Sequence, residues 1–309
     1  MKKTQTENSG KFDFVGKVGF FGGLSVLFVV VSLIYLAIHG VTYGIDFSGG
    51  TELQVKFAQP TTMEQVRVVA DKQKSLINVD MQAFGEGNEF IIRFQTGHGS
   101  TDKETNEIQN KAVISLRDAI TTELSANQPE IRRVDSVGPQ VGAELKRNGF
   151  LAVFYCLLVI LIYVALRFDY KYAPGAVVCL VHDAIITLAI FVLTGREVNV
   201  PILAAILTLI GYSLNDTIVV FDRIRETEHK FKDKGIGFVI NRAINDMFER
   251  TLITSGTVFV SALSLFIFAG GVVSDIAFAM VIGISFGTYS SIYVAAPMIL
   301  MIDKFKKSH

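Results

Sequence analysis

Six long runs of apolar residues divide the chain. The runs are Val18–Ile38, Gly149–Leu166, Ala173–Leu193, Val200–Phe221, Thr251–Ala269 and Ile276–Ile302. A helix rises about 1.5 Å per residue, so about 20 apolar residues cross a hydrocarbon core roughly 30 Å thick. The pattern therefore predicts an α-helical polytopic membrane protein with six transmembrane helices. The first run is longer than the apolar core of about 7–15 residues in a signal peptide, and no small-residue cleavage site follows it, so we expect it to remain as an anchor.

Residues 40–148 separate the first apolar run from the second and have the pattern of a folded domain. Alternating polar and apolar residues predict four strands, and two amphipathic stretches predict helices. In order they are a strand at Glu52–Phe57, a helix from Thr61 and Thr62 to about Leu76, strands at Val79–Phe84 and Glu89–Gln95 joined by a glycine turn, a helix at Asp102–Ser125 and a strand at Glu130–Val137. This order predicts a ferredoxin-like α+β domain inserted between spans 1 and 2.

Composition agrees with membrane insertion and excludes several classes of function. Half of the residues are hydrophobic, 19% are charged and the net charge is zero, so no charge pattern indicates a nucleic-acid partner. Both cysteines, Cys156 and Cys179, lie inside apolar runs, with the spacing of neither a disulfide framework nor a metal site. We therefore expect no metal and no cofactor, and membrane lipids around the spans.

Charge also orients the spans. With residues 1–17 and 303–309 in the cytoplasm, the short inside segments hold sixteen Lys and Arg, whereas the short outside loops hold only Arg196. By the positive-inside rule, both termini are expected in the cytoplasm and residues 40–148 in the periplasm. In the polar segment 222–249, Asp222–Glu226 is expected to continue the fourth helix out of the membrane. The residues after it have apolar side chains at helical spacing, which predicts an amphipathic helix lying on the cytoplasmic face, against either a partner or its own bundle.

Asp216 is the one charged residue inside Val200–Phe221. A charged side chain at the centre of a bilayer costs about 2.5 kcal/mol or more, so it usually faces a bundle interior or a water-filled cavity and often marks a proton or ion path. The alternative is a structural role, in which a neutral Asp216 holds two helices together by hydrogen bonds. Ser213 and Asn215 beside it indicate a polar interior face, which favours the functional role.

Three further polar residues lie within or at the end of apolar runs. His182 and Asp183 are adjacent near the middle of the third run, where neighbouring side chains point about 100° apart, so we expect them not to pair with each other. Either one of them relays a proton to Asp216, or both are packing residues held by hydrogen bonds. Arg250 begins the fifth run and either snorkels to the surface or acts as a counter-charge to Asp216. Together, Asp216, Arg250, Asn215, Asp183 and His182 form the candidate proton-coupling site.

Two glycine-rich junctions flank the inserted domain. Gly44, Gly49 and Gly50 follow the first span, and Gly138, Pro139 and Gly142 precede the second. Neither junction has the lysine or the strand-to-helix placement of a phosphate loop. Because glycine tolerates positive φ and the Gly138-Pro139 pair breaks the preceding strand, both junctions are predicted to be turns and candidate hinges.

Five short runs resemble the SecF family of protein translocase subunits, and together they extend over the whole chain. They are GIDFSGGTEL (Gly44–Leu53), VGPQVG (Val137–Gly142), VHDAIIT (Val181–Thr187), GYSLNDTIVVFDRIRE (Gly211–Glu226) and RTLITSG (Arg250–Gly256). The run that contains Asp216 is the most specific of them. One span, a large outside domain and five further spans also resemble half of the bundle of a resistance-nodulation-division (RND) transporter.

The resemblance implies an activity and partners that the residue pattern alone does not supply. It implies a SecD subunit that provides the other half of the bundle, the SecYEG channel, commonly the accessory subunit YajC, and a translocating preprotein, all at the bacterial inner membrane. It further implies that the proton gradient helps to draw the preprotein out on the outer side. In that family the carboxylate matching Asp216 is linked to the proton, and the arginine matching Arg250 assists it. No enzymatic activity is implied.

Two other functions are open on the residues alone. An RND-type exporter of small molecules or lipids usually has two large outside domains and twelve spans, which is more than this chain contains. An intramembrane aspartyl protease needs two aspartates on facing helices, which Asp183 and Asp216 would supply. The neighbouring His182 and Asn215 do not fit the YD and GxGD pattern of those proteases, and Gly211 lies too far away. Co-purification with a SecD-like partner and a channel would separate translocation from both.

Overall fold

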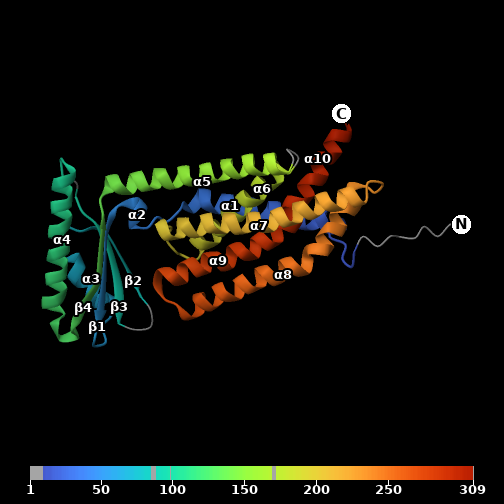
Figure 1. Ribbon diagram of the computed structural model, residues 1–309. Coiled ribbons are helices and arrows are strands. Elements are labelled where there is room, and N and C mark those ends of the chain that lie inside the picture. The colour runs from blue at the N-terminus through green and yellow to red at the C-terminus, as the bar shows by residue number, and fades with distance from the viewer. Residues whose placement is uncertain (1–9, 85–87, 98, 169–171, 309) are drawn as a thin grey trace. The chain divides into compact units, whose positions relative to one another are not determined.

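The alternating pattern of the inserted domain produces the expected sheet. In the computed structural model (Figure 1), the strands are β1 (Gly50–Phe57), β2 (Ile77–Ala83), β3 (Glu89–Gln95) and β4 (Pro129–Val137), and the helices are α3 (Met63–Asp71) and α4 (Asp102–Glu123). All three strand pairings are antiparallel, in the order β2-β3-β1-β4. This is the split βαβ topology of a ferredoxin-like fold, so the prediction is confirmed.

The structure describes residues 10–84, 88–97, 99–168 and 172–308. Within them the chain divides into two units. The sheet unit comprises the described residues of Tyr43–Phe150 and Glu197–Val200, and the helical unit comprises those of Met1–Thr42, Leu151–Arg196 and Pro201–His309. The glycine turn that the sequence predicts before Glu89 falls largely on residues 85–87, outside the described residues.

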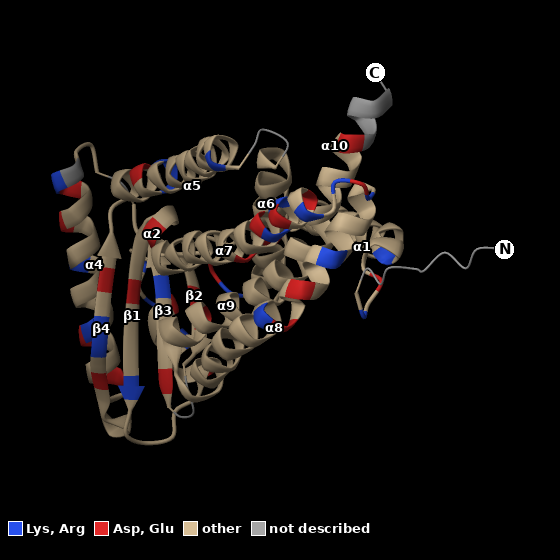
Figure 2. Ribbon diagram, turned by 45° about the vertical axis from the view of Figure 1, so that its right-hand side comes forward, with Lys and Arg blue, Asp and Glu red and all other residues tan. Residues whose placement is uncertain are grey.

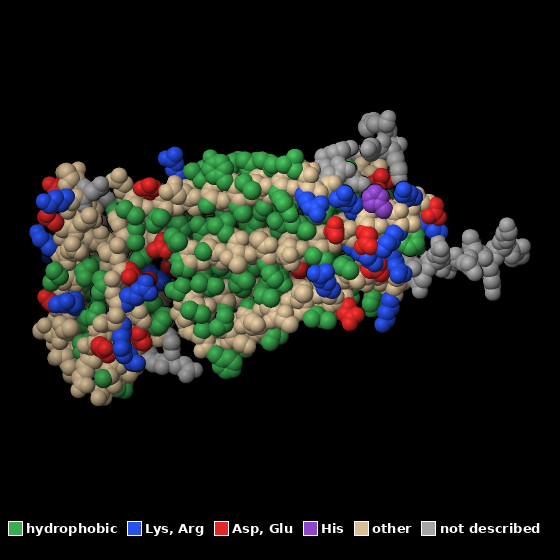
Figure 3. All heavy atoms as spheres, in the orientation of Figure 1, with side chains coloured by type: hydrophobic (Ala, Val, Ile, Leu, Met, Phe, Trp, Pro, Cys, Tyr) green, Lys and Arg blue, Asp and Glu red, His purple; other side chains and the backbone are tan. Residues whose placement is uncertain are grey.

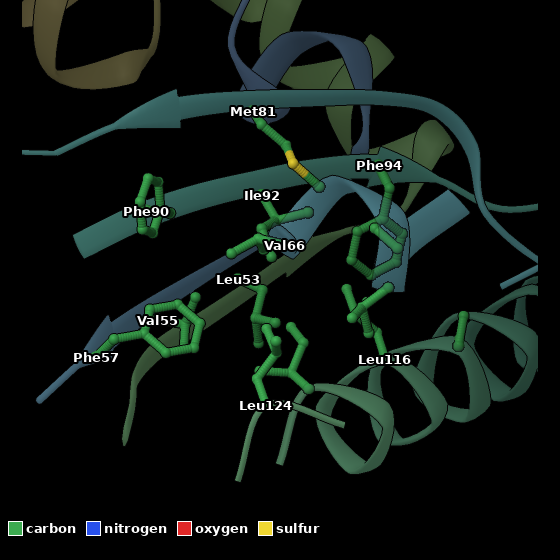
Figure 4. Close-up of a cluster of buried hydrophobic side chains, with 14 residues drawn as sticks. Leu53, Val55, Phe57, Val66, Met81, Phe90, Ile92, Phe94, Leu116 and Leu124 are labelled. Atoms are coloured by element: carbon green, nitrogen blue, oxygen red, sulfur yellow. The ribbon is translucent and has the colours of Figure 1, made fainter. Parts of the chain in front are cut away.

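Alternate residues of the central strands build the core of the sheet unit (Figure 4). Leu53 of β1 lies opposite Ile92 of β3, and neither is exposed. Val66 of α3 and Leu116 of α4 cover this face of the sheet and are also fully buried. Burial of one such side chain contributes roughly 1.5–3 kcal/mol to folding. The apolar residues at alternate strand positions therefore determine which face of the sheet the helices cover.

The start of α3 is confirmed by its cap. The hydroxyl of Thr62 accepts a hydrogen bond from the backbone N–H of Gln65, whose side chain accepts one from the backbone of Thr62. This reciprocal pair satisfies two of the N–H groups that a helix start leaves free. The predicted end near Leu76 is wrong, because the helix stops at Asp71 and the chain reaches β2 through two tight turns at Gln73 and Leu76.

The glycine junctions are confirmed as turns only in part. Gly49 and Gly50 have φ of 69° and 131° and follow the single-turn helix α2 (Ile45–Ser48). Pro139 and Gly142, however, lie in the first turn of α5 (Pro139–Arg167), where the missing N–H of proline costs nothing. A β-carbon at Gly49 would lie 2.9 Å from Cα of Pro139, and one at Gly142 would lie 2.9 Å from the nitrogen of Gly49. The two junctions therefore pack backbone against backbone.

Six helices are long and apolar enough to cross a membrane in the described part of the chain, which confirms the predicted number. They are α1 (Val18–His39), α5, α6 (Ala173–Leu193), α7 (Val200–Lys230), α8 (Ile236–Phe268) and the pair α9 (Gly271–Ser290) and α10 (Ala296–Ser308), which a π-helical turn at Ser291–Ala295 joins. Figure 3 shows apolar side chains over the visible face of these helices.

The segment 222–249 does not form a separate helix on the membrane surface, contrary to prediction. Helix α7 continues to Lys230, and α8 begins at Ile236 and runs without interruption into the fifth span. Figure 2 marks Lys and Arg in blue and Asp and Glu in red along the ribbon of these extensions, and Arg223 of α7 pairs with Asp246 of α8 over 2.5 Å. The apolar stripe is buried inside the helical unit, so the helix packs against its own bundle.

The residues just before the first span form a strap on α8. Asn241 accepts hydrogen bonds from the backbone N–H groups of Phe14 and Val15 over 2.8 and 3.1 Å. Asn245 accepts from the N–H of Phe12 and donates to its carbonyl, both over 2.8 Å. The two side-chain amides thus form the backbone hydrogen bonds that a paired strand would otherwise form. These bonds fix the backbone of residues 12–15.

Candidate functional site

Asp216 is buried on α7, with 4% of its surface exposed. The hydroxyl of Ser255, on α8, donates a hydrogen bond to Oδ2 of Asp216 over 2.9 Å. Arg250, an exposed residue of α8, acts on the same carboxylate through its charge. Helix α8 thus supplies both a hydroxyl donor and a nearby cation to a single acid on α7.

The start of α7, the helix that carries Asp216, is held within the sheet unit. Helix α7 begins at Val200, and Pro201 lies in its first turn, where no intrahelical N–H partner is needed. Within the sheet unit, the carboxylate of Asp46 accepts a hydrogen bond from the N–H of Val200 over 2.9 Å. From this capped end the apolar run continues as one helix through Asp216.

Asn215 and Asp216 do not share an interior face, contrary to prediction. Asn215 is exposed while Asp216 is buried, as neighbours about 100° apart on a helix allow. The exposed side of α7 is a stripe of small and polar residues, which we call the α7 stripe. It consists of Ala204, Thr208, Gly211 and Asn215. A β-carbon at Gly211 would meet no atom within 4 Å, so the surface beside it is open.

His182 and Asp183 pair with each other, which the sequence analysis excluded. Nδ1 of His182 lies 2.9 Å from Oδ1 of Asp183, and both side chains are about 95% buried. The 100° between their Cβ directions does not prevent this, because rotation about the side-chain bonds brings the two ends together. The other carboxylate oxygen, Oδ2, accepts from Ser213 over 2.6 Å and from Ser290 over 2.9 Å.

The two buried carboxylates therefore have different partners. Asp216 bonds to α8 through Ser255, whereas Asp183 bonds to α7 and α9 through the two serines. The sequence pattern did not predict Ser255 and Ser290 as partners of these carboxylates. Ser255 lies within the run Arg250–Gly256, so the resemblance of that run could have indicated it. Nothing in the sequence around Ser290 distinguishes it from the other serines of the apolar runs.

The loop before α7 carries two adjacent residues of opposite charge, one in each unit. In the helical unit, Arg196 pairs with Asp275, and its guanidinium lies 4.6 Å from the ring centre of Phe278. In the sheet unit, Glu197 pairs with Arg93 of β3. Burial lowers the pKa of Arg196. Each charge is thus compensated inside its own unit.

Burial is also the main cause of the raised pKa of Glu197. The nearby carboxylates of Glu52 and Asp80 add to this increase, and the positive charge of Arg93 opposes it. Arg93 is shared, because it also pairs with Glu52 over 2.8 Å. The sheet unit therefore holds a three-membered ion cluster at the point where the chain enters α7.

Two families match the chain. Residues 117–305 match the family described as "Protein export membrane protein SecD/SecF, C-terminal", and residues 34–61 match the "SecD/SecF GG Motif". The second match contains Gly49 and Gly50. The match over residues 117–305 includes every candidate proton-coupling residue, and both matches overlap the sheet unit.

Curated relatives are similar over nearly the whole length. The chain is 41% identical to the protein translocase subunit SecF of Calditerrivibrio nitroreducens, over 97% of each chain. It is 38% identical to that of Vibrio alginolyticus, over 92% of this chain and 87% of the relative.

Solved structures agree with the fold. The crystal structure of SecDF, a translocon-associated membrane protein from Thermus thermophilus, matches 95% of this chain with a TM-score of 0.81 and 30% identity. SecDF in a super-membrane-facing form matches 96% with a TM-score of 0.69. This chain spans 39% of the length of either SecDF chain.

Proposed function

Because the chain belongs to the SecD/SecF family of protein export membrane proteins, we propose that it is the SecF-type half of a SecD–SecF complex at the bacterial inner membrane. In this proposal the complex uses the proton gradient to help draw preproteins out of the SecYEG channel on the outer side, with YajC as an accessory subunit. The named relatives are translocase subunits, which favours translocation over the export of small molecules.

The buried carboxylate of Asp216 carries the proposal. An acid enclosed by helices, with one hydroxyl donor and one nearby cation, has different energies when ionised and when neutral. Loss of its proton strengthens the bond from Ser255 and the attraction to Arg250, both on α8. Proton uptake and release at Asp216 would therefore shift the packing of α7 on α8, which is the mechanical step that we propose.

The α7 stripe supports a helical partner. Asn215 is an exposed amide in a membrane-spanning helix, and an uncovered polar group in hydrocarbon costs free energy. Small residues such as Ala204 and Gly211 permit close approach of a second helix. We propose that the fourth span of the SecD-type subunit covers this stripe, as the pseudo-symmetry of half-bundles suggests.

We also propose that the sheet unit lies in the periplasm, that both termini are cytoplasmic, and that the sheet unit moves during the cycle. The glycine junctions at Gly44, Gly49, Gly50, Gly138, Pro139 and Gly142 stay candidate hinges. The close packing of Gly49 on Pro139 and Gly142 gives these residues a second role, because it holds α2 and the start of α5 together. Motion that preserves this contact would carry both segments as one piece.

The test uses inverted membrane vesicles that contain the assembled complex. Asp216→Asn keeps the shape of the side chain but cannot exchange a proton, so we expect the complex to assemble and the gradient-dependent part of preprotein translocation to disappear. Asp222→Asn, at an exposed position of the same helix, is the matched control and should retain that part. Full gradient-dependent activity in the Asp216→Asn variant would contradict the proposal.

A further inference from the structure

A circuit of buried polar groups joins α6, α7 and α9. Oδ2 of Asp183 accepts hydrogen bonds from Ser213 of α7 and Ser290 of α9. The thiol of Cys179, one turn before Asp183 on α6, lies 3.1 Å from the hydroxyl of Ser290 and 3.7 Å from that of Thr217. The path thus leaves α7 at Ser213 and returns to it at Thr217.

The circuit is closed to solvent and tightly packed. Ser290, Cys179 and Thr217 have no exposed surface, and Ser213 and Asp183 have 2% and 4%. A β-carbon at Gly287 of α9 would lie 3.3 Å from the hydroxyl of Ser213 and 3.5 Å from Oδ2 of Asp183. Even a methyl group at that position would contact Asp183 and press on Ser213, so α6, α7 and α9 approach one another closely at this point.

The two α7 members of the circuit lie one helical turn apart, and Asp216 lies between them in sequence. One residue corresponds to about 100° around a helix. A rotation of α7 by that amount would exchange the buried position of Asp216 for the exposed position of Asn215. Contacts that fix the rotation of α7 about its axis therefore also fix whether the acid faces Ser255.

We propose that Asp183 is a positioning residue that sets the rotation of α7 and so holds Asp216 toward Ser255. The inference rests on the proposed function, because it assigns the residue that orients the proton-linked acid. Asp183 suits this role because both of its oxygens are engaged, Oδ1 by His182 and Oδ2 by two hydroxyls. A proton on Oδ2 would place a donor where two hydroxyls donate, and would disrupt the circuit.

His182 completes the geometry. Its ring lies 6.4 Å from that of Tyr289 at an interplanar angle of 26°, which limits rotation of the imidazole. The ring in turn limits rotation of the Asp183 carboxylate through the bond to Oδ1. His182 and Asp183 are thereby assigned to the support of α7, and the proton-coupling role is left to Asp216 with Arg250.

The test measures the protonation of Asp216 directly. Dicyclohexylcarbodiimide modifies protonated carboxyl groups in apolar surroundings, and mass spectrometry distinguishes a peptide with Asp216 from one with Asp183. In the assembled complex, Asp183→Asn and Ser213→Ala should each shift the pH midpoint of Asp216 modification. Each should also lower gradient-driven translocation by about tenfold, the effect of one lost hydrogen bond to a charged group. Ser285→Ala, which removes an exposed hydroxyl of α9 bonded to its own helix, should change neither.

Two results would overturn the inference. An unchanged midpoint with normal translocation in both variants would show that the circuit only fills space. An unchanged midpoint with translocation abolished in Asp183→Asn would make Asp183 itself a proton carrier. Ser213→Ala keeps every charge, so it carries the test if Asp183→Asn does not accumulate. The pH midpoint of Asp216 modification does not depend on whether Asp216 drives translocation. Failure of the proposed function can therefore be distinguished from failure of this inference.

Discussion

Ser255 of α8 donates its hydroxyl to the carboxylate of Asp216 on α7 over 2.9 Å, and both side chains are 4% exposed. A hydroxyl can donate to an ionised carboxylate and, after rotation, accept from a protonated one. Ser255 can therefore remain bonded to Asp216 in both protonation states. The bond reverses its direction and weakens when the acid is neutral, and this is the change that we propose shifts the packing of α7 on α8.

The first prediction concerns this hydroxyl. Ser255→Ala should lower gradient-driven translocation by about tenfold, since a hydrogen bond to a charged group contributes about 1.5–3 kcal/mol, while the complex still assembles. Translocation into inverted vesicles under an imposed gradient measures the effect. Ser261→Ala removes an exposed hydroxyl of the same helix that bonds to Thr257 and should be neutral. Equal activity of the two variants would remove Ser255 from the mechanism.

The second prediction concerns the α7 stripe. Gly211→Leu places a large side chain on the surface that we propose faces the SecD-type subunit, and should weaken that contact by steric exclusion. Co-purification of the subunit should fall, whereas Gly19→Leu, at an exposed glycine of α1 that is equally open, should leave it unchanged. Retention of the partner and of activity in Gly211→Leu would place the interface on another helix.

The third prediction follows from the raised pKa of Glu197. A carboxyl whose pKa is higher in the folded than in the unfolded protein binds its proton more tightly when folded. Its contribution to stability is therefore lost as pH rises from the unfolded value of about 4.3 toward the raised pKa. Amide exchange of β3 should become faster across this interval in the native protein, beyond the intrinsic pH effect on exchange.

Glu197→Gln removes this titration and should flatten the pH dependence of β3 protection. Glu130→Gln, at an exposed position of β4, serves as the control and should behave as the native protein does. Should the native slope persist in Glu197→Gln, another group of the ion cluster, Glu52 or Asp80, would be responsible for it.

The fourth prediction concerns the glycine junctions. Gly49→Ala combines a left-handed backbone with a β-carbon 2.9 Å from Pro139, and strain of this kind costs about 1–3 kcal/mol. Thermal unfolding of the sheet unit should shift to lower temperature. Gly97→Ala meets no neighbouring atom and should have little effect. A thermal transition of Gly49→Ala that matches the native one would show that α2 and α5 separate readily.

The spans and the sheet could be predicted from the sequence because each rests on a local period. Strand β3 matches its predicted bounds, Glu89–Gln95, and all six spans are present. Helix ends were less predictable. The polar residues Asp222–Glu226 predict that the fourth helix continues out of the membrane, and α7 does continue, to Lys230. The pattern did not predict that α8 runs without a break from Ile236 into the fifth span.

The partners of the buried acids could not be predicted, because they depend on how helices rotate against one another. The sequence identified Asp216 by its isolation in an apolar run. It did not show that Ser255 lies opposite it, that His182 turns to Asp183, or that Asn215 faces outward. A one-dimensional pattern gives the period of a helix but not its angle of rotation in a bundle.

The strap on α8 has a consequence for the order of synthesis. Phe14 precedes its partner Asn241 by 227 residues, and Phe12 precedes Asn245 by 233. At roughly 5–20 residues per second, a ribosome needs roughly 10–45 s to make that interval. Phe12 and Phe14 therefore lack Asn245 and Asn241 while the first four spans and the sheet unit are synthesised. Residues 12–15 can form these hydrogen bonds only once the start of α8 has been synthesised. The strap therefore forms late in the synthesis of the protein.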